Sequence, residues 1–401
     1  MRMWLAALLV AAFGRTTPVP IAQAAEREGA SGLFPIGYDQ SRDMFRRKVS
    51  AHADKLQEPL RPFPIPNRRG DDLTIDHALF GGQGDRLLVI QSGIHGTEAA
   101  AGAAVQMLLL QNHLEALLAN GIDVYVIHAL NPWGFKYARR TDEDNVNLNR
   151  NFSIDGTLFG TASPLYARYR GLFEPAQKVD STLADSLAGD LRMLVEMAAA
   201  GFSSRALTDG LDNGQYEFPQ GLNYGGSKPA VQTAFLRDRL GALMARPYNK
   251  ILFLDFHTGL GDAGALAVIQ GRKPPSALMG ELSGILAGQP GIVFRSGDSP
   301  GFFDTFGDVI DFVPMLAPDP ERVLAVTMEY GTLGSDTLSL LRSAQRLILE
   351  NQAHFHGCAS PSVYAAVRRN FVELFNPSDR LWRRKVIEIA ARIFTLLAAK
   401  F

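Results

Sequence analysis

Two histidines and a glutamate occur in local patterns that could together hold a metal ion. His95 and Glu98 are three residues apart in the stretch QSGIHGTEAAAG, and His257 follows the distant apolar run ILFLDF. Two imidazoles and one carboxylate suit a catalytic zinc, which takes three protein ligands and leaves a fourth position for water. Because His-x-x-Glu alone recurs by chance, these residues form a site only if the fold brings them together.

The segments around these residues predict strands that alternate with helices. Short apolar runs begin at residues 87, 124, 251, 292 and 323, with the sequences LLVIQSG, VYVIHAL, ILFLDFH, IVFRS and VLAVTMEYG. Helical patterns separate several of these runs, at residues 98–120, 181–200 and 229–245. Strands that are apolar on both faces predict an α/β fold with a mixed, mostly parallel sheet covered by helices on both faces.

Polar side chains stand at the ends of three of these predicted strands. His95 and Glu98 follow the first run and precede a helix expected to begin near Glu98. Asp255 and His257 end the third run, and Glu329 lies near the end of the last. Since ligands bind beyond the carboxyl ends of the strands in such sheets, we expect these groups to converge on one edge.

Four motifs, taken in order, resemble the zinc carboxypeptidase superfamily. They are GIHGTE, NPWGFKYARRTDEDNVNLNRNF at residues 131–152, DFHTGLG and TMEYGT, and the resemblance runs from about Phe34 to about Glu350. It is nearest to a bacterial branch in which GQYEFPQGLNYGG is also familiar, and the aspartoacylase and succinylglutamate desuccinylase branch is related. The resemblance implies a carboxypeptidase A-like fold and one Zn²⁺ held by His95, Glu98 and His257.

The resemblance also implies roles for side chains around the metal. Glu329 matches the general base, and Asn149 with Arg150 matches the pair that holds the terminal carboxylate of a peptide. Arg140 matches the arginine that polarises the scissile carbonyl, with Arg139 as the alternative. Arginine suits both tasks, because its planar guanidinium binds a carboxylate through two N–H groups and a fixed cation stabilises a developing oxyanion.

Two positions depart from the pattern of the superfamily. An aspartate that orients a zinc-bound histidine is replaced by Asn147, whose carboxamide oxygen can accept the imidazole N–H but carries no charge. Asp255 is an alternative source of that charge. No tyrosine lies between the third ligand and the general base, where many carboxypeptidases have one that closes over the substrate. Tyr224 and Tyr216, in GQYEFPQGLNYGG, are the candidates to replace it as substrate-binding residues.

These features favour a zinc-dependent hydrolase that cleaves an amide bond in a peptide bearing a free carboxylate. The first alternative is an N-acyl amino acid deacylase of the aspartoacylase type, a branch that shares the His-Gly-x-Glu turn and acts on small acidic substrates. The second is a non-catalytic zinc or ligand-binding module, which the full set of ligands and base disfavours. The expected partner is therefore a peptide or an N-acyl amino acid.

The composition is that of an ordinary globular protein. Its 401 residues are 46% hydrophobic and 20% charged, enough apolar material for a large core. Forty basic against forty-one acidic side chains give a formal net charge of −1, which offers no overall attraction to nucleic acid.

The N-terminus predicts export. Arg2 precedes an apolar stretch over residues 4–13 and a small-residue series over 22–25, the pattern of a cleaved signal peptide at residues 1–25. An uncleaved anchor is the alternative. We therefore expect a periplasmic or secreted protein, although its single cysteine, Cys358, permits no intrachain disulfide.

The remaining chain divides into a hydrolase domain at residues 26–379 and a C-terminal segment at 380–401. That segment, RLWRRKVIEIAARIFTLLAAKF, begins with a basic cluster and continues as a largely apolar helical pattern. It predicts an amphipathic helix that either docks on the core or makes peripheral contact with an anionic membrane surface.

Overall fold

The computed structural model describes residues 32–180, 189, 192–195, 213–271, 276–295 and 305–401. The expected signal peptide at residues 1–25 lies outside the described residues, as does most of the helical pattern expected at 181–200.

The described strands form one mixed sheet of eight strands, in the order β1-β2-β4-β3-β5-β8-β6-β7. The four central strands, β4, β3, β5 and β8, run parallel to one another, and β6 runs parallel to β7. The pairs β1–β2, β2–β4 and β6–β8 are antiparallel. The strands are β1 Arg61–Pro64, β2 Thr74–Phe80, β3 Arg86–Ser92, β4 Ile122–His128, β5 Lys250–Gly259, β6 Leu266–Gln270, β7 Ile292–Arg295 and β8 Val323–Gly331.

All five predicted runs form strands, which confirms the expected mixed, mostly parallel sheet. Three further strands, β1, β2 and β6, were not predicted. The first carries two prolines and lies at the edge of the sheet, where a missing backbone N–H does least harm. The second contains the polar residues Asp76 and His77, which interrupt its apolar pattern.

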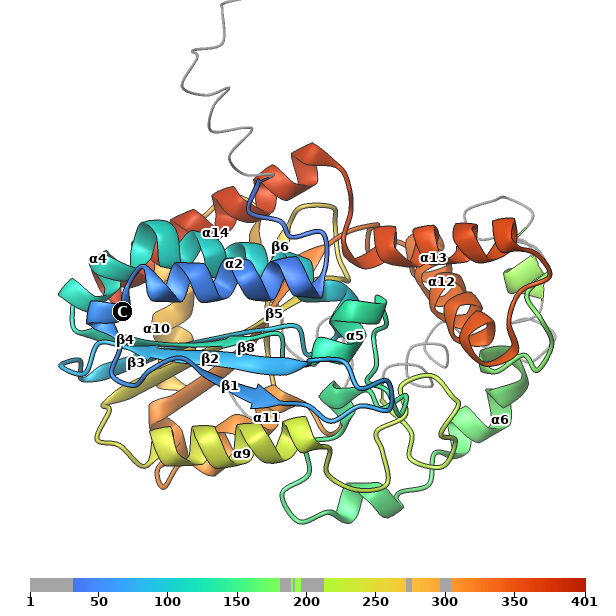
Figure 1. Cartoon of the computed structure of the whole chain (residues 1–401), viewed down its shortest axis with the longest axis horizontal. Coiled ribbons are helices and arrows are strands. Elements are labelled where there is room, and N and C mark those ends of the chain that lie inside the picture. Colours follow the sequence, from blue (N-terminus) through green and yellow to red (C-terminus); the bar gives the residue numbers. More distant parts are fainter. Residues whose placement is uncertain (1–31, 181–188, 190–191, 196–212, 272–275, 296–304) are drawn as a thin grey trace, which may run out of the picture.

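Helices cover both faces of the sheet (Figure 1). One face carries α2, α3, α10 and α14, and the other carries α9 and α11. The α-helices are α2 Tyr38–Ser50, α3 Ala99–Leu108, α4 Leu114–Ala119, α5 Pro132–Tyr137, α6 Pro164–Phe173, α9 Val231–Met244, α10 Ala277–Ile285, α11 Val309–Phe312, α12 Thr337–His356, α13 Pro361–Phe375 and α14 Arg380–Lys400. The shorter helices are η1 Ala53–Lys55, η2 Gly96–Glu98, η3 Leu109–His113, η4 Leu148–Arg150, η5 Thr157–Gly160, η6 Val313–Leu316 and η7 Pro320–Arg322.

Successive side chains of the central strands pack into two apolar clusters, one on each face of the sheet. In β3, Leu88 and Ile90 belong to the cluster under α3 and α14, whereas Leu87 and Val89 belong to the cluster over α9. This alternation follows from the two-residue period of a strand. Because both faces are buried, the central strands read as continuous apolar runs.

The C-terminal segment forms α14, and its apolar side is buried in the core. Trp382, Val386 and Phe394 are at most 4% exposed and belong to the cluster under α3 and α14. The indole N–H of Trp382 donates to the carbonyl oxygen of Gly331, at the end of β8, over 2.8 Å. Contact of this helix with a membrane stays a prediction. Because the apolar side of α14 is buried, such a contact would be made by the basic residues around Lys385.

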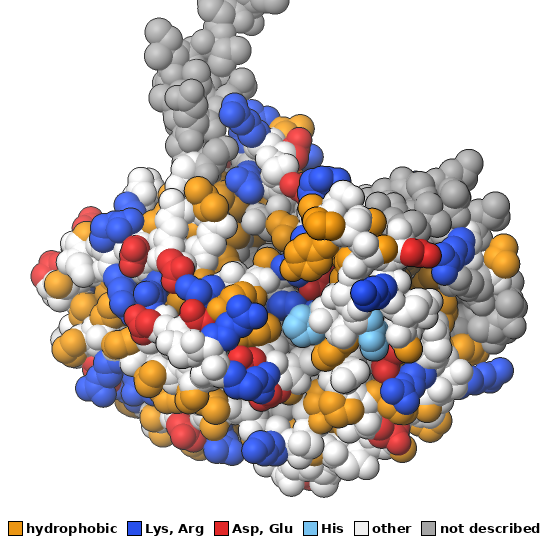
Figure 2. All heavy atoms as spheres, turned by 45° about the vertical axis from the view of Figure 1, so that its right-hand side comes forward, with side chains coloured by type: hydrophobic (Ala, Val, Ile, Leu, Met, Phe, Trp, Pro, Cys, Tyr) orange, Lys and Arg blue, Asp and Glu red, His pale blue; other side chains and the backbone are white. Residues whose placement is uncertain are grey.

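None of the helices in the described part of the chain is long and apolar enough to cross a membrane. On the face seen in Figure 2, acidic and basic side chains lie interspersed over the surface, in keeping with the balanced composition.

Candidate metal centre

The turn after β3 places His95 and Glu98 at the edge of the sheet. His95 precedes η2, and Glu98 is the last residue of η2, directly before α3. Gly96 is required here, because a Cβ at this position would lie 2.0 Å from the carbonyl carbon of Gly134 in α5. The Gly96 N–H donates to the carbonyl oxygen of Arg140 over 3.3 Å, which fastens the turn to the segment carrying that arginine.

Neighbouring strands bring the other two groups to the same edge. His257 lies near the end of β5, and its register partner in the adjacent strand β8 is Glu329. Strand β5 has β8 on one side and β3 on the other. The turn that carries His95 follows β3, so it starts beside the end of β5. The parallel pairing therefore assembles three segments that are far apart in sequence.

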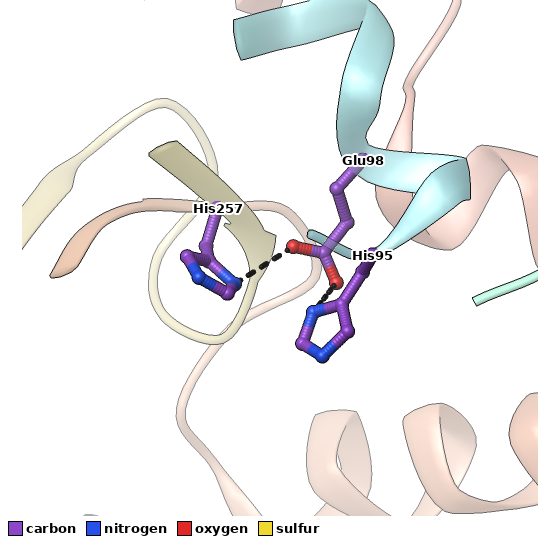
Figure 3. A group of neighbouring side chains, drawn as sticks. All are labelled: His95, Glu98 and His257. Carbon is purple, nitrogen blue, oxygen red and sulfur yellow. Dashed lines mark ion pairs between the residues drawn. The ribbon is translucent and has the colours of Figure 1, made fainter. Parts of the chain in front are cut away.

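Both imidazoles turn one nitrogen toward the Glu98 carboxylate, which lies between the two rings in Figure 3. His95 Nδ1 lies 2.8 Å from Glu98 Oε1, and His257 Nδ1 lies 3.1 Å from Glu98 Oε2. The three side chains are almost completely buried, and one ligand atom from each lies within 4.8 Å of the others. The three residues predicted as zinc ligands are thus brought together.

The opposite nitrogen of each ring has an oxygen partner. His95 Nε2 lies 3.0 Å from Asn147 Oδ1, and His257 Nε2 lies 2.6 Å from Asp255 Oδ2. Asn147 Oδ1 also accepts the backbone N–H of Asn149, so it is the acceptor and His95 Nε2 carries the proton. The two residues weighed as alternatives thus each orient one histidine.

This tautomer leaves a lone pair on His95 Nδ1. That buried nitrogen has no hydrogen-bond partner among the described residues and faces a carboxylate oxygen at 2.8 Å. Two electron-rich atoms at that distance repel each other unless a cation lies between them. Two imidazole nitrogens and one carboxylate also match the ligand types of zinc, so the residues present fit the metal.

The pKa values in the cluster follow from burial and from the surrounding charges. Burial lowers the pKa of His95 to about 4, and the Arg140 guanidinium adds to the effect. Burial also opposes the charged form of His257, but the carboxylates of Asp255 and Glu98 outweigh it and raise the pKa of this ring well above its usual value. The carboxylates of Asp255 and Glu98 therefore attract positive charge, whereas the His95 ring stays neutral.

Glu329 lies in a different environment from Glu98. Burial and the negative charge of Glu98 raise the pKa of Glu329 to about 7. Glu329 Oε1 accepts the backbone N–H of Leu260 over 2.8 Å, which orients the carboxyl group. A carboxyl group that titrates near neutral pH is suited to accept a proton and return it.

One pocket contains these groups, with a volume of about 240 Å³, room for a small organic group as well as water. The three candidate ligands, Glu329 and Arg140 all line it, and so do Asn149 and Arg150. An apolar wall faces them, made by Leu340, Ala344 and Leu347 of α12 and by Leu374 and Phe375 of α13.

The structure distinguishes the two candidate arginines. Arg139 is 4% exposed and pairs with the buried carboxylate of Glu350 at 2.9 Å, so it is used in the packing of α12. Arg140 lies in the pocket, with Nε 3.7 Å from Glu98 Oε1 and Nη1 donating to Asn223 Oδ1 over 2.5 Å.

The two candidate tyrosines do not line the pocket. Tyr224 is 7% exposed and belongs to the apolar cluster over α9, so its expected contact with substrate does not agree with its position. The backbone of Tyr224 instead positions Asn147, because its carbonyl oxygen accepts the N–H of Asn147 over 2.7 Å. The Tyr216 hydroxyl donates to the carbonyl oxygen of Arg150 over 2.7 Å.

Among the pocket residues that sequence reasoning missed are the two that bond to its arginines, Asn223 and Asp308. The Asn223 carboxamide oxygen accepts hydrogen bonds from both Asn147 and Arg140. Asn223 thus links the partner of His95 to the guanidinium in the pocket. Its positive φ of 52° in the stretch LNYGG is the kind of turn signal that asparagine can give. Asp308 is bonded to Arg150, and nothing in its local sequence indicates that contact.

A family model described as "Protein of unknown function (DUF2817)" matches residues 37–389. The chain belongs to the DUF2817 family. The match spans the turn after β3, the strands β5 and β8, and the first part of α14. A search of curated proteins finds no match to this DUF2817 chain.

Several solved structures are similar to this DUF2817 chain. Bovine thrombin-activatable fibrinolysis inhibitor, in complex with tick carboxypeptidase inhibitor, is 12% identical, with a TM-score of 0.46 over 84% of this chain and 98% of that one. Carboxypeptidase A from Helicoverpa armigera is 14% identical, with a TM-score of 0.44 over 79% and 72%.

Proposed function

We propose that the protein is a zinc-dependent hydrolase that cleaves an amide bond in a peptide. The observation that carries the proposal is the convergence of two imidazole nitrogens and a carboxylate on one point of a pocket. On the wall of that pocket stand a carboxyl group with a pKa near 7 and a guanidinium. The motif resemblance to zinc carboxypeptidases supports the same chemistry.

His95, Glu98 and His257 would hold the zinc. When bound, it supplies a Lewis acid that activates water and polarises a carbonyl group. Asn147 and Asp255 keep the two rings oriented for that purpose, since each holds the ring nitrogen that faces away from Glu98.

Glu329 is assigned as the general base. Its carboxylate takes a proton from the attacking water and then delivers that proton to the leaving nitrogen, which completes amide cleavage. The N–H of Leu260 holds Oε1, so the carboxyl group keeps a defined position while it changes its protonation state.

Arg140 is assigned to the carbonyl oxygen of the substrate. Its guanidinium lies in the pocket and is held by Asn223, so a fixed positive charge stands beside the place where negative charge develops. A preorganised donor of this kind contributes about 3 kcal/mol to transition-state stabilisation in comparable sites.

The apolar wall of α12 and α13 favours a substrate with a hydrophobic side chain or acyl group. An N-acyl amino acid deacylase therefore remains the second candidate, with an apolar acyl group in place of a peptide. Arg150 was expected to bind a free carboxylate of the substrate, but it is already paired with Asp308. The proposed function accordingly does not require a terminal carboxylate.

Hydrolysis assays on the zinc-loaded protein test this function, with peptides and N-acyl amino acids as two sets of substrates. Glu329→Gln preserves the shape of the side chain and leaves all three zinc ligands in place. We expect turnover to fall by roughly 100-fold or more, with zinc content nearly unchanged. Wild-type turnover in Glu329→Gln would contradict the assignment of the base, and loss of zinc would make Glu329 a ligand instead.

A further inference from the structure

Arg150 and Asp308 form an ion pair on the wall of the pocket. Arg150 Nη1 lies 2.6 Å from Asp308 Oδ1, and the two side chains are only 7% and 10% exposed. Both residues line the pocket that holds the candidate zinc ligands. Breaking such a pair is costly, because each charge would be left desolvated without its partner.

The backbone fixes Asp308 in this position. The Phe152 N–H donates to the carbonyl oxygen of Gly307 over 3.1 Å. Gly307 has a φ of +75°, and a Cβ there would lie 2.5 Å from the carbonyl oxygen of Arg150, so only glycine allows this approach. The Thr305 hydroxyl donates to the other carboxylate oxygen of Asp308, so both oxygens have a partner in the protein.

The same segment also engages Asn149. Its side-chain oxygen accepts the backbone N–H of Val309 over 3.0 Å. Asn149 and Arg150 are the two residues expected to hold a substrate carboxylate, and both are bonded to the segment around Asp308. The protein thus supplies a carboxylate at the place where a substrate carboxylate was expected.

We propose that Asp308 is a specificity-determining residue, a built-in carboxylate that occupies Arg150 and selects substrates whose end at this position is uncharged. The inference rests on the proposed hydrolase function and deepens it by naming the substrate class. That class is a peptide or acyl compound whose chain continues as an amide past Arg150, or ends there in an uncharged polar group.

Electrostatics explains the selection. Arg150 and Asp308 together are neutral, so a second carboxylate gains little net attraction and meets the like charge of Asp308 in a poorly hydrated site. An amide suffers no such repulsion. Removing the charge of Asp308 while keeping its shape would therefore turn the position into a carboxylate site.

Binding of two small probes tests this without depending on turnover. The probes are 3-phenylpropanoate and 3-phenylpropanamide, which share an apolar ring for the α12 and α13 wall and differ only in charge. Calorimetry on the full-length wild type should show the amide binding at least as tightly as the carboxylate. In Asp308→Asn the carboxylate should bind roughly 10-fold or more tightly than in wild type, because it gains a charge-assisted bond to Arg150.

The double variant Asp308→Asn/Arg150→Gln is the matched control. It should lose the gain in carboxylate binding, which separates binding at Arg150 from binding of the carboxylate to a metal. A wild type that clearly prefers the carboxylate would overturn the proposal. So would an Asp308→Asn variant that folds and shows no gain. If the variant does not fold, the wild-type comparison alone decides.

A kinetic arm separates this inference from the proposed function. Peptides that differ only in a terminal carboxylate or carboxamide should be compared by kcat/KM in wild type and in Asp308→Asn, and the variant should shift the ratio toward the carboxylate. If no amide is hydrolysed but the probe selectivity appears, the proposed function fails and the role of Asp308 stands. If amides are hydrolysed without that selectivity, the role of Asp308 fails and the function stands.

Discussion

At the scale of single residues, the site depends on side chains that orient its ligands. His95 is held by a neutral carboxamide and His257 by a carboxylate, so the two rings have partners of unequal charge. A charged partner raises the basicity of a ligating imidazole more than a neutral one does. We therefore expect Asp255 to contribute more to metal affinity than Asn147.

Asp255→Asn should weaken zinc binding by about 10-fold or more, since the carboxamide orients His257 without the charge. Competition with a chromogenic chelator measures the affinity. Asp123→Asn is the matched control, because Asp123 is also buried but lies at the opposite end of the sheet, where it accepts N–H groups from Gly82 and Gly84. Equal zinc affinity in wild type and Asp255→Asn would show that Asp255 does not support the metal.

At the scale of elements, α14 is part of the core rather than a detachable tail. Phe394 is fully buried in the cluster under α3 and α14, whereas Leu381 on the same helix is 49% exposed. Chemical denaturation should show a loss of about 3–5 kcal/mol in the free energy of unfolding for Phe394→Ala. Leu381→Ala should change it by less than about 0.5 kcal/mol. A small effect of Phe394→Ala would mean that α14 is not packed in this way in solution.

Strand β4 carries a buried histidine that links it to two helices. His128 Nδ1 lies 2.8 Å from Gln106 Oε1 in α3, and Nε2 lies 3.2 Å from Ser41 Oγ in α2. The Gln106 amide N–H groups donate to two backbone carbonyl oxygens, so the Gln106 side-chain oxygen accepts a hydrogen bond from Nδ1–H of His128. Burial lowers the pKa of His128 to about 4, so the ring is neutral near pH 7.

This lowered pKa predicts a pH dependence of stability. Between about pH 6.5 and about pH 4 the unfolded chain binds a proton at His128 that the folded chain does not, so stability falls as the pH falls through this range. One such group contributes on the order of 3 kcal/mol over the interval. In His128→Asn, which cannot titrate there, the free energy of unfolding should fall less steeply with acidification. An unchanged slope would show that His128 is protonated in the folded protein.

At the scale of the whole molecule, the candidate zinc ligands join two segments of the chain that are about 160 residues apart. A metal that binds only the folded state stabilises it by mass action, by about 4 kcal/mol when free zinc is 1,000-fold above its Kd. Zinc should therefore raise the melting temperature of the chelator-treated protein by several degrees. His257→Ala should abolish the shift, and an equal shift in that variant would place the zinc elsewhere.

Much of the fold and of the ligand set could be predicted from the sequence because the signals are local. The five apolar runs that form strands are recognisable as buried segments from their own composition. The two-residue period of a strand then decides which side chains share a face. His95 and Glu98 lie on one short turn, and Asp255 and His257 lie on one face of one strand. Motif order then connected these groups before any contact was known.

The tertiary structure decided what depends on contacts between distant segments. Arg139 and Arg140 are neighbours in sequence, yet only packing against Glu350 removes the first from the pocket and leaves the second in it. Tyr224 was expected to bind substrate, but it is buried in the cluster over α9. Arg150 meets Asp308 across 158 positions of sequence. Local periodicity cannot encode such a contact, because loop packing, not strand pattern, sets which side chains meet.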